Sequence, residues 1–229
     1  FHRPVAGGIK TLTLKRVCGR WYALFSCVVE AQPLPHCDAQ VGMDMGLESF
    51  ATTSDGKRIA NPRYLREAEE ALARAQQRLS RRQKGGHRRR KAARLVARHH
   101  QGVRNRRRDF HHKVARRLVN TYGTIAVEDL RIRNMVRNHS FAKSIVDAGW
   151  GQFISILQAK AAEAGREVVL VNPNGTSQVC SGCGTQVPKS LSERWHLCPG
   201  CGLSMHRDLN ASRNILRLGR SLQGSYAPS

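Results

Sequence analysis

The chain has 229 residues, of which 40% are hydrophobic, a formal net charge of +23 and a pI near 11.1. This length and composition suit one sizeable core with small appendages, so most of the chain is expected to fold. No apolar run reaches the roughly 18 residues of a membrane span and no signal peptide is visible, so we expect no membrane association. Such a high positive charge repels itself in a compact chain and predicts a polyanionic partner, usually nucleic acid.

The first third of the chain has the pattern of β-strands. Residues 9–30 alternate around a turn at Gly19, which predicts a β-hairpin, and the two prolines in residues 31–39 indicate a linker. A short apolar strand follows and carries Asp44. A second strand, residues 49–53, leads through an Asp-Gly turn to a return strand, which is the strongest short-range signal of a hairpin.

From Pro62 the apolar period changes to three and four residues, which predicts two helices that form an antiparallel hairpin over about residues 62–118. Between residues 81 and 117, about two residues in five are Lys or Arg. That density suits contact with a phosphate backbone, although any single basic residue is more often solvated. The candidate phosphate contacts are Arg88, Arg89, Arg90, Lys91, Arg106, Arg107 and Arg108.

The last hundred residues alternate between strands and helices. We expect a short buried strand that ends at Glu128, an irregular basic segment over residues 131–146 and an amphipathic helix from Phe153 to Ala164. A β-branched strand follows at residues 167–173. A final helix is predicted from Asp208 to Leu218, and residues 219–229 are expected to be a disordered tail.

Four of the seven cysteines form two pairs with metal-ligand spacing. The pairs are Cys180-x-x-Cys183 and Cys198-x-x-Cys201, each rich in glycine. Such turns place four thiolates about 2.3 Å from one Zn²⁺, and a shell of four protein ligands is structural rather than catalytic. The odd number of cysteines and the lack of a secretory signal indicate a reducing compartment. The alternatives are four reduced core cysteines or two disulfides.

Three acids stand out in this basic chain because each lies at a strand or a helix start. Asp44 interrupts a buried strand, Glu128 ends another and Asp208 begins the last helix. A buried carboxylate costs several kcal/mol unless it is paired or binds a metal. If the three converge, they can hold two divalent ions, Mg²⁺ or Mn²⁺, for phosphodiester cleavage. Taken singly, Asp208 also fits a helix N-terminal charge and Glu128 an ordinary strand-end acid.

Three separated stretches of the sequence, "VGMDMGLESFATTSDGK", "IAVEDL" and "CSGCG…CPGCG…HRDLNASRNI", follow one another over roughly residues 9–218. In sequence and order they resemble the motifs of the transposon-encoded TnpB nucleases, relatives of the type V CRISPR effectors. The resemblance implies an α/β, RNase H-like RuvC nuclease fold over residues 37–178, with the basic helical hairpin inserted. It also implies a zinc ribbon over residues 179–205 and a final RuvC helix over residues 206–218.

The resemblance further implies roles for individual residues. Asp44, Glu128 and Asp208 match the family's three RuvC acids and would be catalytic ligands of Mg²⁺ or Mn²⁺. The four paired cysteines match the ribbon's zinc ligands. The implied function is an RNA-guided, divalent-metal-dependent DNA endonuclease of the prokaryotic cytoplasm, with a guide RNA and a target DNA as partners.

Residues 1–36 resemble the last strands of the family's wedge β-domain and a linker, and the preceding parts of the family pattern are not in the sequence. A start at Phe1 on strand-like sequence indicates a fragment or a processed chain. Three rival functions remain: a guide-RNA-binding protein that does not cut, a DNA-joining transposase and a plain zinc-ribbon binder of nucleic acid. The sequence carries no signal for an oligomeric state.

Overall fold

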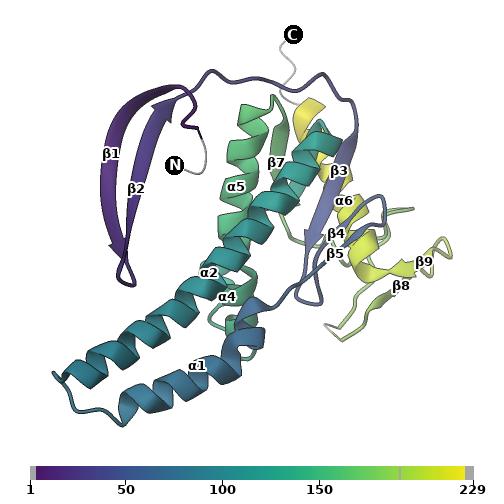
Figure 1. Ribbon diagram of the computed structural model, residues 1–229. Coiled ribbons are helices and arrows are strands. Elements are labelled where there is room, and N and C mark those ends of the chain that lie inside the picture. Colours follow the sequence, from purple (N-terminus) through teal and green to yellow (C-terminus); the bar gives the residue numbers. More distant parts are fainter. Residues whose placement is uncertain (1–3, 191, 225–229) are drawn as a thin grey trace. The chain divides into compact units, whose positions relative to one another are not determined.

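The computed structural model describes residues 4–190 and 192–224 (Figure 1). The chain divides into two compact units, which are described separately. One comprises residues 1–32 and 64–109, and the other comprises residues 33–63 and 110–229. No helix in the described part of the chain is long and apolar enough to cross a membrane.

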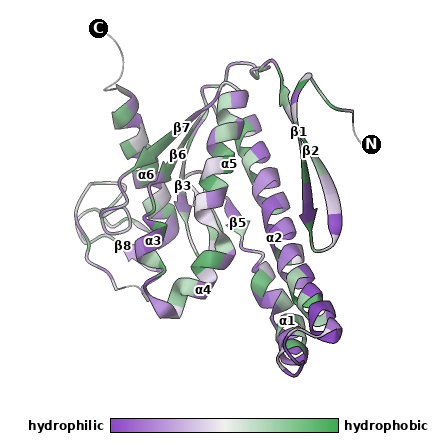
Figure 2. Cartoon of the chain, turned by 90° about the vertical axis from the view of Figure 1, so that its left-hand side faces the viewer, coloured by the Kyte–Doolittle hydropathy of each residue, from purple (hydrophilic) through white to green (hydrophobic). Residues whose placement is uncertain are grey.

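The first unit contains the predicted β-hairpin and most of the predicted helical pair. Strands β1 (Gly8–Val17) and β2 (Arg20–Val28) pair antiparallel, and the turn between them has positive φ at Cys18 and Gly19. Helix α1 (Tyr64–Ser80) precedes helix α2 (His87–Thr121), whose last residues belong to the second unit. Most of α2 is coloured as hydrophilic in Figure 2.

The second unit is built on a mixed five-stranded sheet, which confirms the α/β class. Its strands lie in the order β5-β4-β3-β6-β7. Strand β3 pairs parallel with β6, and β6 pairs parallel with β7, whereas β3–β4 and β4–β5 are antiparallel. The strands are β3 (Gln40–Met45), β4 (Ser49–Thr53), β5 (Arg58–Ala60), β6 (Thr124–Glu128) and β7 (Glu167–Val171).

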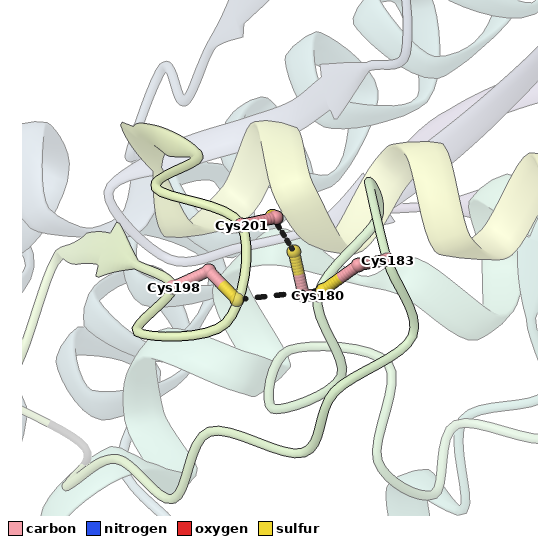
Figure 3. A group of neighbouring side chains, drawn as sticks. All are labelled: Cys180, Cys183, Cys198 and Cys201. Carbon is pink, nitrogen blue, oxygen red and sulfur yellow. Dashed lines mark hydrogen bonds between the residues drawn. The ribbon is translucent and has the colours of Figure 1, made fainter.

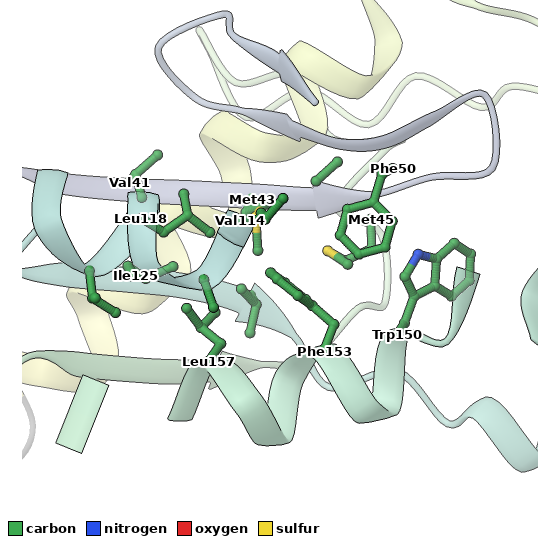
Figure 4. Packing of buried hydrophobic residues seen from close by; sticks show 14 of the residues in the cluster. Val41, Met43, Met45, Phe50, Val114, Leu118, Ile125, Trp150, Phe153 and Leu157 are labelled. Atoms are coloured by element: carbon green, nitrogen blue, oxygen red, sulfur yellow. The ribbon is translucent and has the colours of Figure 1, made fainter. Parts of the chain in front are cut away.

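One face of this sheet carries the main hydrophobic core. Because side chains alternate along a strand, Val41, Met43 and Met45 of β3 point to this face. They pack against the C-terminal turns of α2 and against helix α5 (Trp150–Glu163), as Figure 4 shows. Buried members of the cluster include Val114 and Leu118 of α2, Ile125 and Val127 of β6, and Phe153 and Leu157 of α5.

The opposite face is covered by helix α6 (Arg207–Gly224), which packs on β3 and β6. Two glycines permit this close approach. A Cβ at Gly42 of β3 would lie 2.5 Å from the Leu216 amide nitrogen and closer still to the Ser212 carbonyl oxygen. A Cβ at Gly219 of α6 would lie 2.6 Å from the Cβ of Ala126 on β6. The helix backbone therefore rests almost directly on the two central strands.

The expectation of an irregular segment over residues 131–146 is wrong. The segment forms helix α3 (Ile132–Met135) and helix α4 (His139–Ala148). The Asn138 side chain caps α4 by accepting the Ser140 amide at 3.1 Å, and Gly149 ends it in the left-handed conformation. Ile145 and Ala148 are buried against the core, and this burial offsets the basic character of the segment.

The expected helix end at Leu218 is also wrong, because α6 continues to Gly224. Gly219 does not stop the helix, since it serves the contact with Ala126 instead. The rest of the predicted tail, residues 225–229, lies outside the described residues. Between β7 and α6, the cysteine segment includes a small antiparallel pair of strands, β8 (Trp195–Leu197) and β9 (Ser204–His206).

Candidate active site

Parallel pairing of β3 and β6 brings the first two acids side by side. Met43 is paired with Val127, so Asp44 and Glu128 are the next pair along the two strands. Asp44 lies two residues after Gly42, and Glu128 lies two residues after Ala126. Gly42 and Ala126 both contact α6. Because side chains two residues apart on a strand share a face, both acids point to the α6 face. Asp208 lies in the first turn of α6, at the end of the helix nearest these strand ends.

The three acids line one cavity of about 480 Å³. Two cationic side chains, those of Arg194 and Arg207, line the same cavity. Other lining residues come from the segment that contains α3 and α4 and from the start of α5, and they are largely apolar. They include Leu130, Asn134, Met135, Asn138, Phe141, Ile145 and Trp150.

Burial and mutual repulsion oppose ionisation of the strand acids. Burial, followed by the charges of Glu128 and Asp208, raises the pKa of Asp44 well above its usual value, and Arg207 acts in the opposite direction. Burial also raises the pKa of Glu128, which is only 7% exposed, and a hydrogen bond from Thr176 opposes this. Nearby divalent cations would favour the ionised form of both groups.

Two neighbouring side chains contact the acidic residues. The Thr176 hydroxyl donates to Glu128 Oε1 at 2.6 Å in a buried hydrogen bond. The second is His206, whose Nδ1 lies 3.7 Å from Asp208 Oδ2. The same ring nitrogen accepts the Asp208 amide at 3.3 Å, so His206 fixes the start of α6.

The acids are not gathered as tightly as the ligands of a single ion. In residues 4–190 and 192–224, only the four paired cysteines form a group of three or more candidate ligands whose donor atoms all lie within 4.8 Å of one another. The acids share a wider cavity, and a set of carboxylates spread around a cavity suits two ions about 3.5–4 Å apart. Their oxygen donors fit Mg²⁺ or Mn²⁺.

The four paired cysteines meet at one point, as predicted (Figure 3). The sulfur atoms of Cys180 and Cys201 lie 3.6 Å apart, and those of Cys183 and Cys198 lie 3.5 Å apart. Four sulfurs about 2.3 Å from a tetrahedral zinc would be separated by about 3.8 Å. The observed spacing therefore fits a zinc ion with a closed shell of four thiolates.

Two equivalent turns produce this geometry. In each, the glycine four residues after the first cysteine donates its amide to that cysteine's carbonyl at 2.9 Å, and both glycines, Gly184 and Gly202, have positive φ. The hydrogen bond with Thr185 is the main cause that lowers the pKa of Cys183 to about 6, which favours the thiolate form that binds a metal.

Sequence reasoning missed two buried asparagines that connect the two sites. Asn210 and Asn214 lie one turn apart on α6 and are 0% and 2% exposed. The Asn214 amide donates to the carbonyls of Thr176 and Val179 at 2.9 and 2.7 Å, and the Asn210 amide also donates to Val179 at 2.8 Å. Their spacing of four within "NASRN" is the available signal, because it places both side chains on one helix face.

The candidate phosphate contacts have different surroundings in the first unit. Arg89 donates to the carbonyls of Leu79 and Arg82, so it stabilises the turn between α1 and α2. Arg106 pairs with Glu67 at 3.1 Å and lies over the Tyr64 ring. Arg90 donates to the Gly85 carbonyl. Arg88 and Lys91 are exposed on α2, and Arg107 and Arg108 lie further along the same helix.

The fold and both sites define an α/β protein with a carboxylate-lined cavity and a cluster of four cysteines that could hold a metal ion. The family model described as OrfB_IS605, "Probable transposase", matches residues 25–139, about half of the chain. A second model, "Cas12f1-like, TNB domain", matches residues 150–215, which include all four paired cysteines and Asp208. The chain therefore belongs to the OrfB_IS605 family of TnpB-like proteins, as its motifs predicted.

Curated relatives agree with this assignment. A protein of Streptomyces pristinaespiralis named "Putative RNA-guided DNA endonuclease" is 40% identical over 224 residues, covering 96% of this chain and 56% of that protein. "Putative RNA-guided DNA endonuclease InsQ" of Escherichia coli K12 is 32% identical over 237 residues, covering 96% and 59% respectively. The chain thus spans a little over half the length of these relatives.

Solved structures share the fold at low sequence identity. One, titled as a Cas12f1–sgRNA–target DNA complex, has a TM-score of 0.55 at 18% identity, covering 90% of this chain and 55% of that chain. Another, titled as a CRISPR–Cas12f ternary complex, has a TM-score of 0.57 at 18% identity, covering 86% and 41%.

Proposed function

We propose that this chain carries the nuclease site of an RNA-guided DNA endonuclease, which hydrolyses phosphodiester bonds with Mg²⁺ or Mn²⁺ held by Asp44, Glu128 and Asp208. The observation that carries the proposal is that these three acids, 80 or more residues apart in sequence, line one cavity. The names of the curated relatives support the nuclease assignment and the guide RNA and target DNA as partners.

The surroundings of the acids suit this chemistry. Two divalent ions held by carboxylates activate a water molecule and stabilise the leaving oxygen of a phosphodiester. The protein's own part is to fix the acids: parallel strands place Asp44 and Glu128, and α6 places Asp208. Arg194 and Arg207 line the same cavity and would attract the phosphates of a bound strand.

The finer architecture is part of the same proposal. We assign residues 37–178 and 206–224 to an RNase H-like RuvC domain, into which the helical hairpin of residues 62–118 is inserted. Residues 179–205 form a zinc ribbon that holds one structural Zn²⁺, and residues 1–36 are part of a wedge β-domain with its linker. The mixed sheet and the four-cysteine geometry support these assignments.

Cleavage of a labelled single-stranded DNA oligonucleotide, with and without Mg²⁺ or Mn²⁺, tests the nuclease site. We expect Asp44→Asn to slow cleavage on the order of 100-fold or more, because bound ions supply several kcal/mol and each 1.4 kcal/mol is tenfold. Asp38→Asn is the matched control, since that side chain is 94% exposed on the linker before β3. Equal residual cleavage by both variants would overturn the proposal.

The role of RNA is tested by sequencing the RNA that copurifies with the chain. We then expect metal-dependent cleavage of DNA that matches this RNA, and none of scrambled DNA. The family description names a transposase, so the products must also be inspected for joined strands. Joined donor ends would favour a DNA-joining enzyme, and sequence-matched binding without cleavage would favour a guide-RNA-binding protein that does not cut.

A further inference from the structure

A buried chain of hydrogen bonds runs from the carboxylate site to the four-cysteine centre. It begins at Glu128, whose carboxylate accepts the Thr176 hydroxyl at 2.6 Å. This distance is typical of a hydroxyl that donates to an ionised oxygen. The same hydroxyl lies 3.1 Å from the Pro173 carbonyl, but its single proton serves the shorter contact.

The backbone of Thr176 is held by α6. The Asn214 amide group donates to the Thr176 carbonyl at 2.9 Å and to the Val179 carbonyl at 2.7 Å. Thr176 is 4% and Asn214 2% exposed, so water does not compete for these bonds. The position of the Thr176 hydroxyl therefore depends on how residues 176–179 lie on α6.

The same loop leads directly into the first cysteine turn. Asn210 donates to Val179 at 2.8 Å and accepts the Ser181 amide at 2.8 Å, on either side of the metal ligand Cys180. Cys180 itself is fully buried beside α6, which passes behind the four cysteines in Figure 3. Only three residues lie between Thr176 and the ligand Cys180 along the chain.

We propose that Thr176 is a positioning residue for Glu128, and that Asn214 couples it to the four-cysteine centre. In this arrangement, the metal-loaded ribbon holds the loop of residues 176–180 on α6 and thereby fixes the Glu128 carboxylate for its ion. The inference rests on the proposed carboxylate site. It makes the cysteine-bound metal a determinant of divalent-ion affinity at a separate site, rather than only a local structural element.

Mn²⁺ affinity, measured on the full 229-residue chain by the electron paramagnetic resonance signal of free Mn²⁺, tests the proposal without relying on cleavage. Outer-shell partners of metal ligands typically change affinity by about 10–100-fold, so we expect Thr176→Val to weaken Mn²⁺ binding at least tenfold. Thr176→Ser keeps the hydroxyl and should bind within about twofold of wild type. If the Thr176→Val variant does not fold, Thr176→Ala takes its place.

Two further variants test the coupling. Asn214→Ala should weaken Mn²⁺ binding by a similar factor while one zinc per chain remains, and its effect should not add to that of Thr176→Val. Cys183→Ser, which removes an exposed zinc ligand, should also weaken Mn²⁺ binding. Asn174→Ala is the control, because that side chain is exposed and lies two residues from Thr176.

Failure of this inference is distinguishable from failure of the proposed function. If Asp44→Asn lowers Mn²⁺ affinity but Thr176→Val does not, the carboxylate site stands and the role of Thr176 is overturned. If Asn214→Ala and Cys183→Ser both bind Mn²⁺ normally, the coupling is overturned. If Asp44→Asn leaves Mn²⁺ affinity unchanged, the carboxylate site and this inference both fail.

Discussion

Gly42 of β3 lies directly beneath Leu216 of α6, and a Cβ at Gly42 would come within 2.5 Å of the Leu216 amide nitrogen. The obstructing atoms are two backbone atoms of the helix and the Leu216 Cβ, which is fixed by the backbone, so no side-chain rotation can make room. This contact sets how closely α6 approaches the strand that carries Asp44, and it therefore sets the distance between Asp44 and Asp208.

We expect Gly42→Ala to push α6 away from the sheet and to destabilise the chain by about 1–3 kcal/mol or more, as overpacked cores do. Thermal unfolding should show a melting temperature several degrees lower. Gly102→Ala is the control, because a Cβ there meets nothing within 4 Å and Ala favours a helix interior. A Gly42→Ala variant as stable as wild type would contradict the close packing of α6.

The proposed zinc site makes a prediction about thiol reactivity. With zinc bound, we expect only Cys18, Cys27 and Cys37 of the seven cysteines to react with a thiol reagent in the native protein. A strong chelator should expose Cys183 and Cys201 first, because both are exposed at the surface, and the buried Cys180 and Cys198 more slowly. Titration of free thiols beside elemental zinc analysis measures this. Seven reactive thiols before chelation would contradict a metal centre.

Local patterns in the sequence were sufficient to predict those parts of the site that lie within a single helix, strand or loop. The strands that carry Asp44 and Glu128, the helix that begins near Asp208 and the two cysteine pairs were all predicted, because alternation, periodicity and ligand spacing are short-range signals. The site itself depends on pairing β3 with β6, whose paired residues lie 84 positions apart in sequence, and no local pattern reports that pairing.

Other parts depend on tertiary contacts that no local pattern reports. Helix α4 was missed because its segment is basic, and its stability comes from burying Ile145 and Ala148. Thr176 is an unremarkable loop residue until the fold brings it to Glu128. Gly42 in "VGMDMG" did carry a signal for the close packing of α6, since a glycine inside a strand often marks the close approach of another backbone.

Acid stability should depend on Asp55 in the turn after β4. Although burial alone would raise its pKa, hydrogen bonds from Lys57, Thr53 and Tyr122 lower the pKa of Asp55 well below its usual range. Tyr122 donates to it at 2.7 Å and joins the β4–β5 turn to the end of α2. A folded-state pKa below the unfolded value stabilises the fold above about pH 4, and this contribution is lost as the pH falls further.

We therefore expect Asp55→Asn to lower the free energy of unfolding near neutral pH and to flatten its decline below about pH 5. Urea unfolding at a series of pH values measures both effects. Asp38→Asn, at an exposed position, should follow the wild-type curve. Parallel pH curves for Asp55→Asn and wild type would show that this turn does not contribute to acid stability.

The basic residues of α1 and α2 should separate into two groups by their effect on salt dependence. Arg88 and Lys91 are exposed on α2, so the double variant Arg88→Gln, Lys91→Gln should bind RNA more weakly. Each lost phosphate contact should reduce the slope of log affinity against log salt by about 0.7–0.9. Arg106, which pairs with Glu67 and covers Tyr64, should instead affect stability.

Fluorescence anisotropy with a labelled RNA of about 20 nucleotides, over about 50–200 mM salt, measures these slopes. The control Arg106→Gln should leave the slope nearly unchanged and lower the stability by up to about 1 kcal/mol, since its ion pair is half exposed. An unchanged slope in the double variant would remove Arg88 and Lys91 from the phosphate contacts. An equal loss of slope in Arg106→Gln would mean that Arg106 leaves Glu67 to bind the nucleic acid.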